Sequence, residues 1–362
     1  MQAPIALMLG WLSFGSADIT NDEAVVFYPT FASWDAQQSN WLVSVHGAIF
    51  EPELDSRKRA VLIHTLRGAL RIDKASAEAK LLTQRLQLFL VDSERGKTVS
   101  IQLGSQQHQL NASEPNGHFY GSFRLTEDEA EKLLAGPVRR PAWLPFEAVT
   151  NKDDQRQFLG RVQFVTEQGL SVISDIDDTV KETFVTERTQ MLANTFTRTF
   201  RAVDGMAQMY RSAADKGAVF HYVSGSPWQL YVPLSAFFAE ERLPPGSFHL
   251  KHFRMKDSTL FDLFASHEAS KNQAIGDIVT SFPRRQFVLV GDSGEQDPEI
   301  YGVIARRFGD RIAAIFIRDV TNEPKESERY ATAFRDIEAA RWHVFSKPEQ
   351  IQSTFLELFQ KE

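Results

Sequence analysis

Several stretches in the first half of the chain alternate apolar and polar residues with the two-residue period of a β-strand. They span residues 24–28, 41–50, 86–91, 118–125 and 158–165. Turn-forming residues such as Pro115-Asn116-Gly117 separate them. The pattern predicts a β-rich, sandwich-like amino-terminal domain.

Residues 53–70 and 75–82 instead have the spacing of amphipathic helices. One face of the first is apolar and carries Leu62, Leu66, Ala69 and Leu70. Such a face could pack against the neighbouring domain, which is the commoner arrangement, or rest on a membrane surface.

The pattern changes in the second half of the chain. Short, continuous apolar runs at residues 170–174, 219–223 and 286–290 alternate with helical stretches, which is typical of buried parallel strands in an α/β fold. A chain of 362 residues also exceeds one ordinary domain. We therefore expect a β-rich domain over residues 18–166 and an α/β domain over residues 167–362.

Composition narrows the classes of partner. The chain has 40 Lys and Arg against 47 Asp and Glu, a net charge of −7, which argues against a nucleic-acid binder. This charge gives no overall attraction to an anionic membrane, so peripheral contact with lipid would need a local basic or apolar patch. Without Cys, the chain forms no disulfide and carries out no thiol chemistry.

The first 17 residues allow two interpretations. An apolar stretch over residues 3–15 ends in Gly15-Ser16-Ala17, a pattern suited to signal-peptide cleavage, which would place the mature protein in the periplasm or outside the cell. Because no Lys or Arg precedes this stretch, it could also be a first strand or buried helix of a cytoplasmic protein. No run reaches the length of a membrane-spanning helix.

The carboxylate string Asp175-Ile-Asp-Asp-Thr179 directly follows the apolar run at residues 170–174. Residues at the carboxyl end of a parallel strand face the crevice where such sheets bind ligands. Two carboxylates so close together need a cation such as Mg²⁺, and one could attack a phosphoryl group while the other handles the leaving-group proton. A calcium loop would need Gly and Glu where Val180 and Thr186 stand, whereas capping of a following helix is a simpler use of the aspartates.

A second polar segment follows the apolar run at residues 219–223. Ser226 has the position of a helix cap, with Pro227 at the first helical position and Gln229 closing a capping box. The free N–H groups of such a terminus could hold a phosphate, with the hydroxyl of Ser224 as an added donor. A helix that is merely well capped would leave Ser224 unused.

A lysine occupies the core-facing side of the helical run 268–282. Lys271 shares one stripe with Ile275, Ile278 and Phe282, so its ammonium needs a charge partner. It could reach the nucleophile and the phosphate and neutralise charge in the transition state, or simply extend its amine to water from a helix start.

Two further carboxylates follow the apolar run at residues 286–290. Asp292 stands at the carboxyl end of that run, where it could complete a metal site. Asp297 precedes Pro298 and a helical stretch, so it either supports the metal or only caps that helix.

In order along the chain, these segments resemble the four motifs of the haloacid dehalogenase superfamily of phosphotransferases. Within that superfamily, residues 165–320 resemble the conserved catalytic domain of the actin-patch-associated phosphatidate phosphatases and their bacterial relatives. The resemblance is carried by Asp175-Ile-Asp-Asp-Thr179, Asn194-Thr-Phe196, Phe200-Arg-Ala202, Tyr222-Val-Ser-Gly-Ser-Pro-Trp-Gln-Leu-Tyr231 and Val290-Gly-Asp-Ser-Gly-Glu-Gln-Asp-Pro-Glu-Ile-Tyr301.

The resemblance implies a Rossmann-like parallel sheet with a helical insertion after Thr179, and Mg²⁺-dependent hydrolysis of phosphatidate through an aspartyl-phosphate intermediate. It implies Asp175 as nucleophile, Asp177 as general acid and then base, and Lys271 as the stabilising charge. It further implies a phosphate site with the anchor Ser224 beside Thr179, Gly225 and Ser226, and a metal site at Asp175, Asp177, Asp292 and Asp297.

Two other functions stay open. The same chemistry could act on a soluble phosphate ester, because nothing in the four motifs recognises an acyl chain. The protein could also be a non-catalytic module that binds lipid or protein. Asn194, Arg198 and Arg201 in the insertion, and Arg318 after a later strand, could contact the substrate or make internal pairs.

Overall fold

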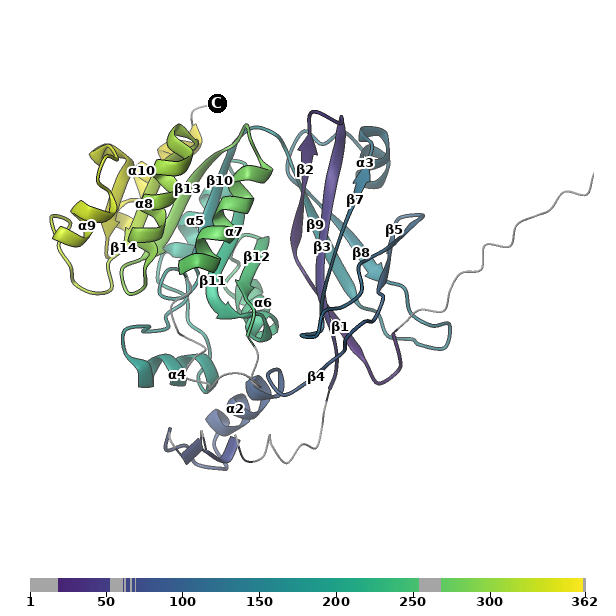
Figure 1. Ribbon diagram of the computed structural model, residues 1–362. Helices are drawn as coiled ribbons and strands as arrows, with labels where there is room; N and C mark the ends of the chain where they lie inside the picture. The colour runs from purple at the N-terminus through teal and green to yellow at the C-terminus, as the bar shows by residue number, and fades with distance from the viewer. Residues whose placement is uncertain are drawn as a thin grey trace, which may run out of the picture.

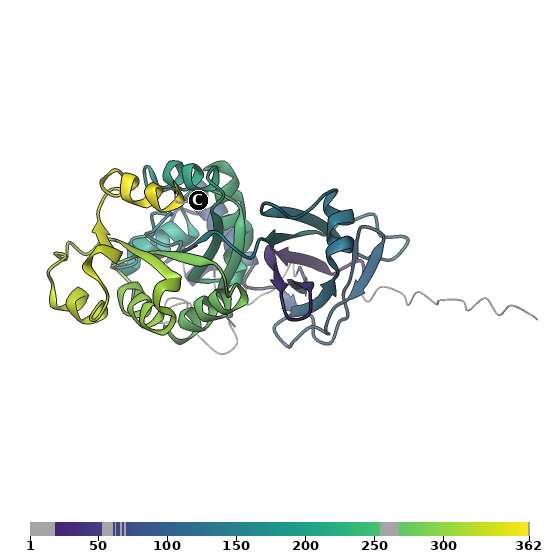
Figure 2. The same ribbon diagram turned by 90° about the horizontal axis from the view of Figure 1, so that it is seen from above.

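The computed structural model describes residues 19–52, 70–253 and 268–360, together with residues 61, 63–65, 67 and 68. Its elements form two β-sheets that lie side by side, one from each half of the chain (Figures 1 and 2). The predicted signal peptide and most of the predicted helix at residues 53–70 lie outside the described residues.

The amino-terminal sheet has nine strands in the order β1-β3-β2-β9-β8-β5-β6, with β4 and β7 also paired to β3. The prediction that this half is rich in β-strands is confirmed. Its strands belong to one continuous sheet, because the long strand β3 pairs with β1, β2, β4 and β7. The sheet curves around its own apolar core (Figure 2). The strands are β1 (Ala24–Tyr28), β2 (Thr30–Asp35), β3 (Asn40–Glu51), β4 (Asp92–Ser93), β5 (Ser100–Leu103), β6 (Gln106–Gln109), β7 (His118–Leu125), β8 (Ala142–Ala148) and β9 (Leu159–Val165).

The strands predicted at residues 24–28, 41–50, 118–125 and 158–165 are confirmed as β1, β3, β7 and β9. The strand predicted at residues 86–91 is wrong, because helix α2 (Ala77–Gln87) runs into that stretch. Leu82 and Leu86 are both fully buried, one helical turn apart, so packing favours the helix over the local alternation. The helix predicted at residues 75–82 is thereby confirmed and extended.

The second sheet is parallel throughout, with strand order β12-β11-β10-β13-β14-β15. The α/β prediction is confirmed. Alternate residues along its strands contribute to two separate cores, one packed against α5, α6 and α10 and the other against α7, α8 and α9. The strands are β10 (Leu170–Ser174), β11 (Val219–Pro227), β12 (Gly246–Lys251), β13 (Gln286–Asp292), β14 (Ile312–Arg318) and β15 (Trp342–Phe345). The helices are α5 (Met206–Ala214), α6 (Tyr231–Glu240), α7 (Glu268–Ser281), α8 (Asp297–Phe308), α9 (Glu328–Ala333) and α10 (Gln352–Glu357).

The strand order defines where a ligand should bind. From β10 the chain proceeds outward through β11 to β12, and then returns to the other side of β10 to form β13. The direction of winding therefore reverses beside β10, which is the topological switch point at which open α/β sheets bind ligands.

Hydrogen bonds and aromatic contacts connect the halves of the chain. Helix α2 packs near α4 (Arg188–Phe196), the predicted helical insertion, where Arg85 Nη1 donates to the carbonyl of Thr195 at 2.6 Å (Figure 1). At the edge of the second sheet, the N–H of Phe248 in β12 donates to the carbonyl of Pro29 at 3.1 Å.

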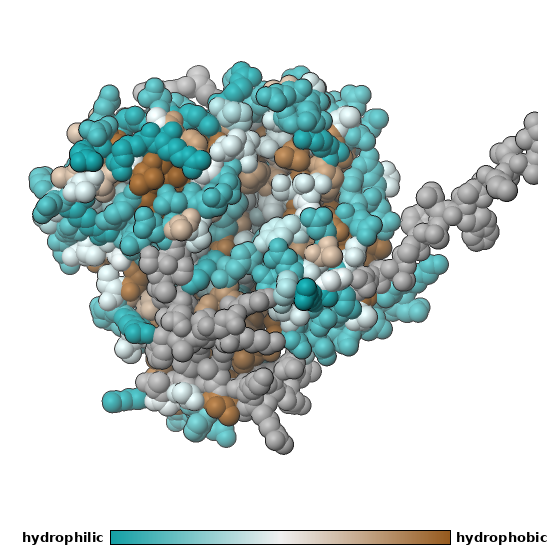
Figure 3. Space-filling model, viewed as in Figure 1, coloured by the Kyte–Doolittle hydropathy of each residue, from teal (hydrophilic) through white to brown (hydrophobic). Residues whose placement is uncertain are grey.

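The face drawn in Figure 3 is largely hydrophilic, with small apolar patches. Within the part of the chain that the structure describes, no helix combines the length and the apolar character needed to cross a bilayer.

Candidate active site

The predicted site residues meet at one edge of the parallel sheet. Asp175 directly follows β10, Ser224 lies within the last part of β11, and Asp292 ends β13, so three neighbouring strands position them. The N–H of Asp175 donates to the carbonyl of Val290 at 2.8 Å, which continues the pairing of β10 with β13.

Three buried carboxylates face one another at this edge. Asp175, Asp292 and Asp297 are fully buried and each offers an oxygen within 4.8 Å of the others. Among the described residues, Asp175 Oδ2 and Asp292 Oδ2 have no hydrogen-bond partner. Buried, unpartnered carboxylate oxygens are the donor set that Mg²⁺ takes, so these residues fit the predicted metal.

Burial and the repulsion between neighbouring carboxylates raise the pKa values of Asp175 and Asp292. Burial raises the pKa of Asp175 well above its usual value, and Asp297 adds to the rise. Burial likewise raises the pKa of Asp292, with Asp297 and Asp175 adding to it. Full ionisation of these acids therefore needs added positive charge.

Lys271 on α7 provides part of that charge. Its Nζ donates to Asp175 Oδ1 at 2.9 Å, contacts Asp297 Oδ1, and lies 3.7 Å from Glu295 Oε2. Burial opposes the charged form, but Asp175 and Asp297 raise the pKa of Lys271 well above its usual value. The predicted core-facing stripe of this helix is confirmed, because Lys271 is buried together with Ile275 and the rest of the stripe.

Asp297 does more than begin a helix. Gln296 is the cap residue of α8 and no side chain caps it, so the interpretation of Asp297 as only a helix cap is wrong. Its Oδ2 instead accepts from the N–H of Asp292 at 3.2 Å. This approach requires Gly291, because a Cβ at that position would lie 2.1 Å from Asp297 Oδ2.

Asp177 lies outside the three-acid group, and its carboxylate is fully engaged elsewhere. Oδ1 pairs with Lys181 Nζ at 2.7 Å and accepts from Thr183 Oγ1 at 2.8 Å. Oδ2 accepts from Ser224 Oγ at 3.0 Å and from Ser226 Oγ at 2.7 Å. The structure therefore places the Asp177 carboxylate beside Ser224 and Ser226, the segment predicted to bind phosphate, whereas the sequence predicted it as a metal ligand.

The same bonds correct the interpretation of Ser226 as a helix cap. Strand β11 continues to Pro227, and the 3-10 turn Trp228–Leu230 that follows has no side-chain cap. The hydroxyl of Ser226 donates to Asp177 instead, because an ionised carboxylate is a stronger acceptor than neutral groups. Ser224 Oγ also accepts from the N–H of Ser226 at 2.9 Å, which makes a tight turn around Gly225.

Sequence reasoning missed Lys181, which is 2% exposed and faces Asp177. Burial alone would raise the pKa of Asp177, but Lys181 and the hydroxyls that bond it lower that pKa to about 2. Asp177 is therefore ionised at neutral pH in this structure. Helical or strand spacing could not reveal the lysine, because it stands in an irregular turn.

Asp178 shapes the loop that carries these contacts. Its carboxylate accepts from the N–H groups of Thr183, Phe184 and Val185 at 2.7, 2.8 and 2.6 Å. Arg318, a candidate substrate contact, donates to the carbonyl of Asp178 at 2.6 Å and so makes an internal pair.

The insertion residues support the same loop. Asn194 Nδ2 donates to the carbonyl of Thr183 at 3.2 Å, and Arg198 donates to Asn194 Oδ1 at 3.0 Å. By contrast, the hydroxyl of Thr179 is buried without a hydrogen-bond partner among the described residues, so it is available to a ligand.

Residues 170–319 match the family described as the catalytic domain of phosphatidate phosphatase APP1. Phosphatidate phosphatase APP1 of Saccharomyces cerevisiae is 37% identical over 164 residues, which cover 44% of this chain and 27% of that protein. An uncharacterised protein of Schizosaccharomyces pombe is 37% identical over 175 residues, which cover 46% of this chain and 28% of that protein. The matched region thus spans just over a quarter of each curated relative.

A crystal structure of phosphoserine phosphatase in its apo form covers 51% of this chain and 97% of its own, with 11% identity and a TM-score of 0.32. A similarity this low carries no conclusion about this protein.

Proposed function

We propose that this protein, whose residues 170–319 belong to the APP1 phosphatidate phosphatase family, is a Mg²⁺-dependent phosphatase that converts phosphatidate to diacylglycerol and phosphate. The observation that carries the proposal is the group of Asp175, Asp292 and Asp297 around Lys271, at the carboxyl edge of the parallel sheet. Mg²⁺ held by the three acids would neutralise charge on the phosphoryl group.

In this mechanism Asp175 is the nucleophile. Lys271 holds its Oδ1, while Oδ2 is free of hydrogen bonds from the described residues and can attack phosphorus. The new O–P bond forms as the bond to the leaving alkoxide breaks, and water then cleaves the aspartyl phosphate. Lys271 remains beside the reacting oxygen and stabilises the charge that develops there.

Asp177 handles the proton in both steps. Its ionised state suits the second step, in which it accepts a proton from the attacking water. In the first step it must already carry a proton to give to the alkoxide. An approaching phosphate dianion favours this uptake, because a nearby negative charge raises the pKa of a carboxyl group.

The phosphate would sit between Thr179 and the turn at residues 224–226. Thr179 offers a buried hydroxyl that has no hydrogen-bond partner among the described residues, and the hydroxyls of Ser224 and Ser226 donate to Asp177. Gly225 between them carries no side chain that would keep a phosphate from the backbone.

Removing the metal should separate this function from its alternatives. We expect phosphate release from phosphatidate in mixed micelles with Mg²⁺, and its loss with EDTA, because the three acids repel one another without a cation. Glycerol 3-phosphate provides the matched soluble ester. Release from that ester alone would retain the chemistry and reject the lipid substrate, while no release from either would favour a binding module.

The rim of the site offers an apolar contact for a lipid. Phe184 is 42% exposed and has a left-handed backbone with φ of 62°, a conformation that is costly for a bulky residue. Its neighbour Thr183 bonds Asp177, and its other neighbour Val185 packs against Gly294 beside Asp292. The chain therefore holds an aromatic ring outward between the two halves of the site.

We expect Phe184→Ala to lower kcat/KM for phosphatidate about fivefold, from about 1 kcal/mol of lost apolar contact. Alanine keeps the strain of the left-handed backbone, so the change tests the ring alone. For Phe184→Ala, kcat/KM on glycerol 3-phosphate should stay at the wild-type value. Phe184→Leu should retain most of the activity on phosphatidate. Equal losses on both substrates would show that the ring supports the site and does not contact an acyl chain.

A further inference from the structure

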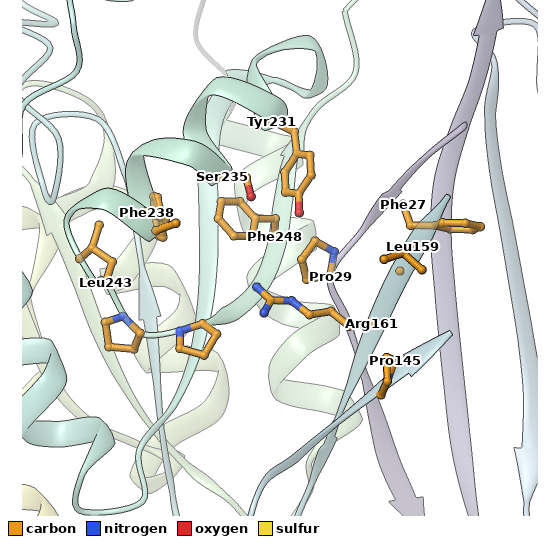
Figure 4. A pocket seen from close by; sticks show the side chains of 14 residues that line it. Phe27, Pro29, Pro145, Leu159, Arg161, Tyr231, Ser235, Phe238, Leu243 and Phe248 are labelled. Atoms are coloured by element: carbon orange, nitrogen blue, oxygen red, sulfur yellow. The ribbon is translucent and has the colours of Figure 1, made fainter. Parts of the chain in front are cut away.

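A second concave site lies between the two sheets, away from the catalytic edge. This interdomain cleft has a volume of about 640 Å³ and runs between strands of the amino-terminal sheet and helix α6 (Figure 4). Its size falls within the range of roughly 300–1,000 Å³ that small-molecule sites occupy. None of Asp175, Asp177 or Lys271 is among the described residues that line it.

Apolar side chains form both walls of the interdomain cleft. Pro145 and Leu159 lie on the amino-terminal side, and Phe238 in α6, Leu243 in the loop after it and Phe248 in β12 line the other side (Figure 4). Leu159 is 67% exposed at this cleft, which is unusual for a large aliphatic side chain. Apolar walls of this kind favour an aliphatic ligand.

A few polar groups interrupt this lining. Among the described residues of the cleft, Arg161 alone is charged, and Figure 4 shows its guanidinium directed toward the opposite wall. The guanidinium carbon lies 4.6 Å from the centre of the Trp143 ring, which holds it in place through a cation–π contact.

Two hydroxyls face Arg161 from α6. Burial raises the pKa of Tyr231, while a hydrogen bond with Ser235 and the charge of Arg161 lower it. Figure 4 shows the hydroxyls of Tyr231 and Ser235 on the α6 side of the cleft, opposite the guanidinium of Arg161. One cation and two hydroxyls can together bind a single anionic group.

The cleft is built on fixed contacts. The backbone bond from Phe248 to Pro29 joins its two walls, and the rings of Tyr28 and Tyr231 pack edge to face with centres 5.0 Å apart. A preformed cleft loses little conformational entropy when a ligand binds.

We propose that the interdomain cleft binds a single-chain amphiphile with an anionic head. The head lies on Arg161 with Tyr231 and Ser235 as added donors, and the chain lies along the walls at Leu159 and Phe238. The site is separate from the phosphatase centre and does not depend on its activity.

Calorimetry on the full chain tests this assignment, with dodecanoate as the probe below its micelle concentration and dodecyl maltoside as the neutral amphiphile. Dodecanoate carries no phosphate, so the catalytic site cannot hydrolyse it. We expect saturable binding of one dodecanoate, at least about fivefold weaker in Arg161→Gln because a charge-assisted hydrogen bond is lost. Ser235→Trp should fill the cleft and remove binding.

The matched control is Arg95→Gln, which removes an exposed arginine from the same half of the chain but outside the cleft. It should bind dodecanoate as the wild type does. Absence of saturable binding, equal affinity for dodecyl maltoside, or an unchanged affinity in Arg161→Gln would each overturn the proposal. Arg161 is exposed, so this variant should fold even if Ser235→Trp does not.

Discussion

Phosphate release should fall by at least about a thousandfold when Asp175 is replaced by asparagine, because an amide oxygen cannot form the aspartyl phosphate. The amide keeps the shape of the side chain and can still accept the hydrogen bond from Lys271. Substrate should therefore still bind, and the loss should appear in kcat. Steady-state kinetics on the best substrate, with Mg²⁺ present, measures it.

The same variant should remain at least as stable as the wild type without metal. Burial and Asp297 raise the pKa of Asp175, so its ionised form is disfavoured in the folded protein and a neutral amide relieves that cost. Thermal unfolding in EDTA checks this expectation. Asp277→Asn, at an exposed position of α7, is the control and should change neither kcat nor the unfolding temperature. Substantial activity in Asp175→Asn would exclude Asp175 as the nucleophile.

The second large effect is expected from Lys271→Met, which removes the ammonium and keeps an apolar stem of similar length. Asp175 and Asp297 would then be buried without their cation, which typically costs about 3–5 kcal/mol in the free energy of unfolding. We also expect kcat to fall at least about a hundredfold, since a charge beside the reacting oxygen is lost. Urea unfolding and steady-state kinetics measure the two effects.

Added Mg²⁺ provides a sharper test of this variant. If the three acids bind the ion, Mg²⁺ should stabilise Lys271→Met, because it binds the folded state and replaces part of the missing positive charge. Lys216→Met changes an exposed lysine in the turn between α5 and β11 and should behave as the wild type. Stability unaffected by Mg²⁺ in Lys271→Met would argue against a metal at these carboxylates.

The sequence predicted the strands whose pattern is unambiguous. β1, β7 and β10 have the expected bounds, because alternation or a continuous apolar run extends over their whole length. β6 could not be found, since its sequence Gln-Gln-His-Gln has no apolar period. The error at residues 86–91 arose because Leu86, which fits the alternation, also lies one helical turn after Leu82 on the buried face of α2.

The site was predictable wherever a strand delivers the residue. Asp175 follows β10, Ser224 lies near the end of β11 and Asp292 ends β13, so their meeting at one edge follows from the parallel sheet. The partners of Asp177 were not predictable, because Lys181 and Thr183 reach it through a turn that the Asp178 carboxylate holds by backbone hydrogen bonds. Such a turn has no period that a sequence can show. The catalytic and binding roles of these residues stay predictions.

Strand β12 is one of the two edge strands of the parallel sheet, and an uncovered edge strand invites pairing with another copy of the chain. The backbone bond from Phe248 to Pro29 and the aromatic contact between Phe31 and His221 place the amino-terminal sheet over this border. The amino-terminal half therefore protects its neighbour against self-association. A fragment that begins near residue 167 would lose this protection, and its poor solubility would say nothing about its catalytic residues.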